Sequence, residues 1–273
     1  LLLDMKTNLA CRICRSRRLK RFLDFGETPL ANAFVAPGDL GRPEPRYPLR
    51  VFFCEDCGLS QLTEVVSPEI LFRDYVYFTS GMPRVPEHFR NYANEIVDRF
   101  VPGPRGLVVE IGSNDGIFLV PVKERGVGVL GVDPALNIAR VANERGIETL
   151  PEFFSESLAR NIRSKYGPAD AIIGNNVVAH IDDHHDLVRG VSFLLNDGGA
   201  FVFEAPYLTD MFERLAFDSI YHEHLSYLSL RPLARLFSQY GMEIFDAKTF
   251  PVQGKSIRVY AGKAGEHAVS PHV

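Results

Sequence analysis

Residues 107–116, which read LVVEIGSNDG, constrain the fold more than any other part of the chain. The apolar run Leu107–Ile111 predicts a strand, and a glycine-punctuated turn and a helix-forming stretch follow it. A second apolar run, 127–132, ends in Asp133, 23 residues after Glu110. This order is typical of the first βαβ unit of a doubly wound sheet, where small ligands bind at the carboxyl ends of the strands.

The turn after the first strand indicates which ligand the sheet could hold. Its spacing is Glu110-x-Gly112-x-x-x-Gly116, which differs from the G-x-G-x-x-G that cradles the pyrophosphate of a dinucleotide. A loop with acidic residues suits a cationic or hydroxyl-rich ligand better. S-adenosylmethionine fits this description, because its sulfonium and α-amino groups are positive and its ribose offers two hydroxyls to Asp133.

Strand and helix patterns alternate regularly from residue 105 onward, which predicts an α/β fold with a mostly parallel sheet covered on both faces. The expected strands are 107–111, 127–132, 170–174, 199–204, 243–247 and 256–261, with a weak one at 147–150. The expected helices are 116–125, 135–145, 155–165, 184–195 and 230–240. We therefore divide the chain into residues 1–66, a helical connector at 67–104, and a ligand-binding domain at 105–273.

All four cysteines fall into two C-x-x-C pairs in the first segment: Cys11, Cys14, Cys54 and Cys57. Paired motifs of this kind predict a structural Zn²⁺ site with four thiolates. Two disulfides or a redox role remain as alternatives. The segment is rich in turn residues, and only Tyr47–Cys54 alternates like a strand, so a metal would substitute for a core.

Composition excludes several broad classes. The chain has 273 residues, of which 46% are hydrophobic and 23% charged, with a net charge of −4. No global attraction to nucleic acid or to a membrane surface is expected, and no apolar run reaches the length of a membrane span. A basic run at 12–21 is interpreted as a solvated face beside the metal site. We expect a cytoplasmic protein.

Polar residues gather where strands of the sheet end. Asn175, Asn176 and Glu204 follow two apolar strands, so they should share a crevice with Gly112 and Asp133.

A second polar cluster, Tyr221-His222-Glu223-His224, lies in a loop. In an extended segment His222 and His224 would lie on one side, with Glu223 opposite. These histidines could bind a catalytic metal or simply lie on the surface, but the interpretation that we favour is a general-base histidine with neighbours that orient it. The adjacent residues His184 and His185 are interpreted as the start of a helix.

Several of these motifs occur together in one family. They are the two C-x-x-C pairs, the segment 25–32 (Phe-Gly-x-x-Pro-Leu-Ala-Asn), the segment 110–116, Asn175-Asn176 and Tyr221-x-Glu223-His224. In this combination the chain resembles the zinc-containing sugar C-methyltransferases of antibiotic deoxysugar biosynthesis, which act on nucleotide-linked 4-keto sugars. The resemblance covers nearly the whole chain. It implies a Rossmann-like class I methyltransferase domain behind a small zinc-binding domain.

The resemblance also implies roles for particular residues. The S-adenosylmethionine site would comprise Gly112, Asn114, Gly116, Asp133, Phe154 and Asn176, and we add Glu110 and Asn175 from their places at the strand ends. His224 would be the catalytic base, in a loop with Tyr221 and Glu223. Tyr221 or His180 would stabilise an enolate oxygen, and Glu223 would orient His224 or contact the sugar. His180 and Tyr75 would lie near the sugar, with Tyr77 as the alternative to Tyr75.

The resemblance ends before the family's full length. Members of the family continue into a C-terminal domain that helps to hold the nucleotide, and this sequence stops at Val273. A truncated chain is the simplest account of that difference. A segment similar to His-Gly-Gly-Ser-x-Arg reads Gln253-Gly-Lys-Ser-Ile-Arg258, in which Lys255 and Arg258 could meet a phosphate.

The expected function is C-methylation of a nucleotide-linked 4-keto deoxysugar, with dTDP as the expected nucleotide and with neither nucleic acid nor membrane as partner. Three alternatives remain open: an O- or N-methyltransferase of a small metabolite, a zinc module that binds nucleic acid, and an NAD-dependent oxidoreductase. The absence of G-x-G-x-x-G disfavours the last of these.

Overall fold

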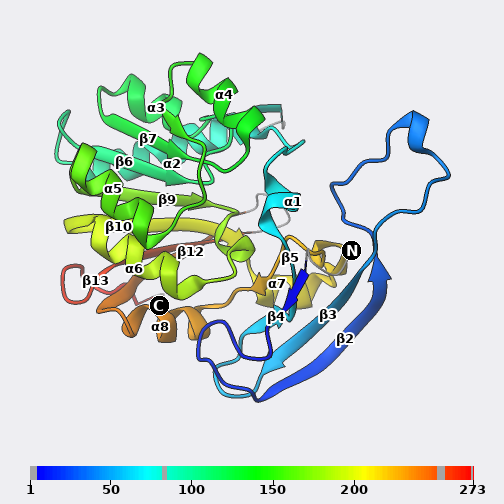
Figure 1. Cartoon of the computed structure of the whole chain (residues 1–273). Helices are drawn as coiled ribbons and strands as arrows, with labels where there is room; N and C mark the ends of the chain where they lie inside the picture. Colours follow the sequence, from blue (N-terminus) through cyan, green and yellow to red (C-terminus); the bar gives the residue numbers. More distant parts are fainter. Residues whose placement is uncertain (1–4, 82–84, 251–255, 272) are drawn as a thin grey trace.

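A computed structural model describes residues 5–81, 85–250, 256–271 and 273 of the chain. Its centre is a seven-stranded sheet in the order β12-β13-β10-β9-β6-β7-β8 (Figure 1). The strands are β6 (Leu107–Ile111), β7 (Gly128–Val132), β8 (Thr149–Leu150), β9 (Ala169–Asn175), β10 (Leu195–Pro206), β12 (Met242–Phe250) and β13 (Ser256–Lys263). The strands expected from the sequence are all present.

The sheet is mostly parallel, as expected. The strands β8, β7, β6, β9 and β10 pair in parallel, whereas β13 runs antiparallel to both of its neighbours, β10 and β12. This order with one reversed strand next to the edge is the Rossmann-like fold of class I methyltransferases. The parallel strands bring the carboxyl ends of β6, β7, β9 and β10 to one edge of the sheet.

Helices cover both faces of the sheet because the central strands are apolar on both sides. Buried side chains of α2 (Val85–Phe100), α3 (Leu119–Glu124) and α4 (Leu136–Glu144) pack with Val108, Val202 and Tyr260. The helices α5 (Glu156–Tyr166), α6 (His184–Leu194) and α8 (Leu230–Ser238) pack with Phe201 and Phe203 on the other face. Alternating β10 residues therefore enter two separate cores.

The first 66 residues contain more strands than the sequence predicts. Besides β3 (Tyr47–Cys54) there are β1 (Met5–Thr7), β2 (Leu19–Thr28), β4 (Ser60–Leu62) and β5 (Glu64–Val66). The expectation of a single strand is wrong because β2 is a largely exposed edge strand without apolar alternation, and the others are only three residues long.

This N-terminal unit is joined to the rest of the chain through a shared sheet. The four-stranded sheet β11-β4-β3-β2 takes its β11 (Ser226–Tyr227) from the segment directly after the Tyr221–His224 cluster. Buried Cys11, Cys54 and Leu59 belong to the same apolar cluster as Leu233 and Phe237 of α8. The unit thus shares its core with the larger domain, beside which it lies in Figure 1.

The connector contains two helices. It begins with α1 (Pro68–Phe72) and ends with α2, in which Phe89, Tyr92 and Ile96 are buried as their helical spacing predicts. The remaining short elements are α7 (Leu208–Arg214) and single helical turns at Pro37–Asp39, Thr79–Gly81, Val178–His180 and Phe217–Ser219. Within the described residues, no helix has both the length and the apolar character needed to cross a membrane.

Candidate active site

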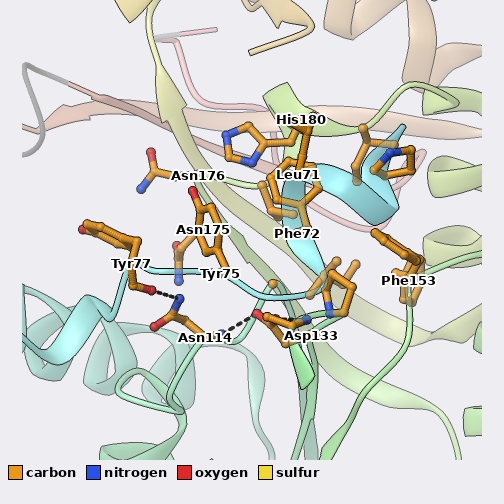
Figure 2. A pocket seen from close by; sticks show the side chains of 18 of the residues that line it. Leu71, Phe72, Tyr75, Tyr77, Asn114, Asp133, Phe153, Asn175, Asn176 and His180 are labelled. Carbon is orange, nitrogen blue, oxygen red and sulfur yellow. Dashed lines mark hydrogen bonds between the residues drawn. The ribbon is translucent and has the colours of Figure 1, made fainter. Parts of the chain in front are cut away.

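A cavity of about 630 Å³ opens where β6, β7, β9 and β10 end (Figure 2). All three segments of the chain line it. The N-terminal unit contributes Asn32, the connector contributes Phe72, Tyr75 and Tyr77, and the loops of the methyltransferase-like domain form the remainder. Apart from Glu204, the residues expected at the strand ends therefore do converge, and the connector covers them.

The floor of the cavity is the turn after β6. The Gly112 N–H donates to the carbonyl of Val132 at 2.8 Å, and the Asn114 N–H donates to Asp133 Oδ2 at 2.9 Å. Gly112 has φ +66°, and a Cβ there would lie 2.9 Å from the Cβ of Val177. Only glycine fits this position without strain, since both the backbone and the space exclude a side chain.

Asn114 fastens the connector over this turn. Its side-chain nitrogen donates to the Tyr77 carbonyl at 3.0 Å, and its Oδ1 accepts the Thr79 N–H at 2.9 Å. Figure 2 shows Asn114 between Tyr77 and Asp133. The second carboxylate oxygen of Asp133 accepts the Ala135 N–H at 2.9 Å, and each oxygen keeps a lone pair for a ligand.

Glu110 and Asn175 form a buried pair at the neighbouring strand ends. The Asn175 side-chain nitrogen donates to Glu110 Oε1 at 2.9 Å. Glu110 Oε2 and Asn175 Oδ1 are buried without a hydrogen-bond partner among the described residues. Burial raises the pKa of Glu110 well above its usual range, and the nearby carboxylates act in the same direction. A cationic donor in the cavity would satisfy both oxygens and offset this cost.

The remaining residues expected at the cofactor site divide into two groups. Asn176 and Phe154 line the cavity, and the Asn176 N–H donates to the Glu204 carbonyl at 2.8 Å. Gly116 does not line it, since its φ of +79° turns the chain and a Cβ there would lie 3.1 Å from Ile147. Gly116 thus shapes the loop from outside the cavity.

His224 also lines the cavity, and it is held in one tautomer. Its Nδ1 lies 2.7 Å from the carbonyl of Ser219, which can only accept, so Nδ1 carries the proton. The bare Nε2 then accepts the hydroxyl of Tyr221 at 2.9 Å. Burial lowers the pKa of His224 and raises that of Tyr221. The pair is therefore a neutral imidazole beside a protonated phenol.

His180 lies between two rings. Its ring stacks on Phe72 at 5.5 Å between ring centres and on His224 at 5.1 Å. Its Nε2 has no hydrogen-bond partner among the described residues, and burial lowers its pKa well below the usual range. His180 is thus a neutral ring next to the expected base, with a nitrogen left for a ligand.

Glu223 does not orient His224, contrary to one of the roles expected for it. Its carboxylate accepts the Tyr75 hydroxyl at 2.8 Å and the Asn32 side-chain nitrogen at 2.7 Å. Burial raises the pKa of Glu223, although both hydrogen bonds oppose that shift. Glu223 therefore orients Tyr75, while the Ser219 carbonyl orients His224.

The Tyr221–His224 cluster is a turn, so the side-by-side placement expected for its two histidines is wrong. The His224 N–H donates to the Tyr221 carbonyl at 3.0 Å, which reverses the chain. His222 points into the N-terminal unit, where its Nε2 lies 3.2 Å from the Tyr47 carbonyl. The two rings therefore cannot hold one metal ion.

The four cysteines converge as the sequence predicts. Their Sγ atoms all lie within 4.8 Å of one another, and the contacts Cys11–Cys57 and Cys14–Cys54 measure 3.5 and 3.4 Å. A disulfide needs about 2.05 Å, so the thiols are free. Four thiolates at this separation can hold a tetrahedral Zn²⁺ and leave no position for substrate.

Two expectations about the sheet edge need correction. Glu204 faces the α2 side of β10 with Val202, where it pairs with Arg258 at 2.7 Å and His88 at 2.9 Å, and it does not line the cavity. Arg258 does not line the cavity either, because its guanidinium donates to Glu204 at 2.7 Å and to Glu95 at 2.8 Å inside the fold. Lys255, the other residue expected there, lies outside the described residues.

The expected helix start is confirmed. The helix α6 begins at His184, and the side chain of Asp183 caps it by accepting the Asp186 N–H at 2.9 Å.

Three contributors to the site were missed. Asn32 and Phe72 reach it through contacts distant in sequence, although Asn32 stands in a quoted motif. Ser219 acts through its backbone carbonyl, so its side chain gives no signal.

Two known protein families match this chain, one for each of its two main parts. Residues 11–72 match the family described as "Putative zinc binding domain", and residues 86–247 match the family described as "Methyltransferase domain". The C-methyltransferase NovU of Streptomyces niveus is 39% identical over 264 residues, which is 96% of this chain and 63% of NovU. The chain thus spans less than two thirds of that relative's length.

Solved structures agree on the fold. Magnesium protoporphyrin IX methyltransferase from Synechocystis PCC 6803, with bound SAH, aligns with a TM-score of 0.50 at 15% identity, over 69% of this chain and 88% of that one. A chain from the complex of the Haloferax volcanii Trm112 methyltransferase activator with a methyltransferase gives 0.51 at 15% identity, over 68% and 93%. With the family match covering more than half of its residues, this chain belongs to the methyltransferase-domain family.

Proposed function

We propose that S-adenosylmethionine binds at the strand-end part of the cavity. Its amino group suits the buried oxygens of Glu110 and Asn175 that have no partner in the part of the chain that the structure describes, and Asp133 can accept from the ribose hydroxyls. Among the described residues that line the cavity there is no lysine or arginine, which suits a cationic ligand better than a pyrophosphate. When bound, this group supplies an electrophilic methyl carbon.

The turn at Gly112 gives a direct test of this assignment. We expect Gly112→Ala to weaken S-adenosylhomocysteine binding at least about tenfold, because the left-handed backbone costs about 1–2 kcal/mol and the new Cβ meets Val177. Isothermal titration measures the affinity, with NADH as the negative control. Gly126→Ala is the matched variant, since Gly126 has φ +78° but open space around it. Equal weakening in both variants would contradict the assignment.

We further propose that the chain is part of a C-methyltransferase that acts on a nucleotide-linked 4-keto deoxysugar, with dTDP as the nucleotide. The observation that carries this proposal is the neutral His224, held by Ser219 with its bare Nε2 beside a phenol, in the cavity that also contains the Gly112 turn. A carbon next to a ketone needs such a base near the carbon and a donor near the oxygen. The name of the relative from Streptomyces niveus supports carbon as the acceptor.

Each of the residues around His224 has a separate role in the proposed reaction. The Tyr221 hydroxyl leaves His224 when the sugar binds and donates instead to the ketone oxygen, which frees Nε2. His224 then takes the proton from the adjacent carbon, and the electron pair moves onto the oxygen that Tyr221 holds. His180 stacks on the His224 ring, and its Nε2, which no other described residue contacts through a hydrogen bond, is left for the substrate. Glu223 and Asn32 fix Tyr75 against the sugar, and the shared cavity holds the two reactants together.

Hydrogen exchange separates this function from methylation of a hydroxyl or an amine. We expect the enzyme to exchange the proton next to the C4 ketone with solvent deuterium when S-adenosylhomocysteine replaces the methyl donor, because enolate formation precedes methyl transfer. Mass spectrometry or NMR of the recovered nucleotide sugar measures the exchange. Methylation without exchange, on an oxygen or a nitrogen, would favour the O- or N-methyltransferase instead.

The activity should also depend on pH through His224. A base works only when it is unprotonated, so the rate rises as pH increases through its pKa. Because burial lowers that pKa, we expect the rising limb of kcat/KM below the ordinary histidine value of about 6.5, with a plateau above it. A rising limb near pH 8 would assign the base to another group.

The basic run offers little support for nucleic-acid binding. Arg12 is buried, Arg18 pairs with Asp56 at 3.0 Å, and Arg21 pairs with Asp24 at 2.8 Å. We therefore propose the nucleotide sugar, and no nucleic acid, as the partner of this chain.

A further inference from the structure

Arg12 is a buried cation between the first two cysteines. Its side chain is 1% exposed, and Nε donates to Asp182 Oδ1 at 2.8 Å. Nη1 donates to the Leu62 carbonyl and, at 3.3 Å, to the Leu225 carbonyl. One guanidinium therefore joins the cysteine cluster to two loops of the methyltransferase domain.

Both loops carry histidines of the proposed site. Asp182 follows His180 by two residues, and Leu225 directly follows His224. The two rings stack at 5.1 Å, so a shift of either loop changes their contact. The Leu225 carbonyl also accepts the Leu62 N–H of β4 at 2.9 Å, which clamps the end of the turn to the N-terminal unit.

The chemistry of the contact requires arginine. A buried cation is costly unless it is paired, and Arg12 pairs with Asp182 at 2.8 Å. Asp182 is shared, since it also accepts the Asn8 side chain at 2.7 Å and pairs with Lys6 at 2.6 Å. A planar fork can reach a carboxylate and two carbonyls in different directions at once, whereas an ammonium is a single point charge.

We propose that Arg12 is a positioning residue for the reaction: through Asp182 and the Leu225 carbonyl it holds the His180 and His224 rings in place. The zinc-binding unit then contributes to catalysis as well as to stability. This inference rests on the proposed function, because His224 matters only if it is the base. An arginine that merely anchored the N-terminal unit would need no acceptor next to either histidine.

Kinetics on three variants test the proposal. We expect Arg12→Lys to lower kcat about 10²-fold, the effect of misplacing a reacting group by about 1 Å, with unchanged zinc content and S-adenosylhomocysteine affinity. Asp182→Asn should also lower kcat, and it leaves the cysteine segment intact if Arg12→Lys does not fold. Arg18→Met removes an exposed cation of the same unit and should match the wild type. If Arg12→Lys and Asp182→Asn turn over like the wild type, the proposal is wrong.

A second readout does not depend on turnover. In ¹⁵N-histidine-labelled protein, the His224 Nδ1 proton that donates to Ser219 should exchange slowly in the wild type and rapidly in Arg12→Lys, while the His267 signals stay unchanged. An unaltered His224 proton would overturn the positioning role. If instead His224 responds but the wild type methylates no 4-keto sugar, the positioning contact stands and the proposed function fails.

Discussion

His224→Gln is expected to abolish methyl transfer while leaving S-adenosylhomocysteine binding intact. A general base contributes about 10²–10⁴-fold, and glutamine keeps a polar side chain of similar reach without a basic nitrogen. The ring belongs to a different loop from the Gly112 turn, so its loss should not disturb the strand ends. Single-turnover assays measure the rate, and isothermal titration measures binding.

The matched variant for this experiment is His222→Gln. His222 lies two residues earlier in the same turn, but its ring contacts Tyr47 in the N-terminal unit, outside the cavity. We expect it to retain turnover with some loss of stability. Persistent methyl transfer in His224→Gln would remove His224 as the base, and equal losses in both variants would indicate damage to the turn.

Deuterium exchange distinguishes the proposed roles of His224 and Tyr221. Without a base the substrate carbon keeps its proton, so His224→Gln should lose exchange and methyl transfer together. Tyr221→Phe should retain the neutral imidazole but lose the donor to the enolate oxygen. A His224 variant that exchanges normally but does not methylate would assign His224 to positioning the sugar.

The central sheet could be predicted from sequence because its strands are short apolar runs that end in glycine or acidic residues. Parallel pairing then forces Gly112, Asp133, Asn175 and Asn176 to one edge, whatever the side-chain details. The side on which Glu204 lies was also open to prediction. Glu204 follows Val202 by two residues on the same strand, and side chains two residues apart lie on the same face of a sheet. Because Val202 faces α2, Glu204 lies on that face as well.

The catalytic contacts could not be predicted in the same way. Glu223 meets Asn32 across 191 residues of sequence, and no local pattern encodes that pairing. His224 takes its tautomer from a backbone carbonyl, which every residue possesses. The sequence favours an extended Tyr221–His224 segment, but the hydrogen bond from the His224 N–H to the Tyr221 carbonyl makes a turn, and His222 and His224 therefore point into different regions.

The N-terminal strands escaped prediction for a related reason. In β2 most side chains are exposed, so its residues show no alternation, and its pairing with β3 comes from backbone hydrogen bonds. The cysteines, in contrast, were informative because thiolates at fixed spacing have few uses in a chain of this kind. The convergence of the four cysteines was therefore predictable, while the attachment of their unit to the Tyr221–His224 turn through β11 was not.

Substitution of a cysteine in the cluster is expected to cause a large loss of stability. We expect Cys54→Ser to lose the bound metal and to destabilise the protein by more than about 4 kcal/mol, the range of single substitutions that remove a metal site. For a chain of this size that corresponds to a fall in Tm of about 10 °C or more. Cys54 is fully buried in the core that also contains Leu233 and Phe237 of α8, so the damage should extend beyond the N-terminal unit.

Ile13→Val is the matched control, because Ile13 is fully buried between Cys11 and Cys14 but binds no metal. Removal of one buried methylene group should cost about 0.5–1.5 kcal/mol and leave one zinc per chain. Metal analysis and thermal unfolding distinguish the two variants. A strong chelator applied to the wild type should reproduce the Cys54→Ser result if the cluster holds zinc.

Zinc removal should also stop turnover at temperatures where the central sheet stays folded. The strand β11 pairs with β4, and Asn32 reaches Glu223 from the N-terminal unit, so loss of that unit releases the turn that carries His224. S-adenosylhomocysteine affinity should fall far less, since the Gly112 turn and Asp133 depend on β6 and β7. Chelated protein with unchanged turnover and Tm would show that the four thiols do not support the active site through a metal.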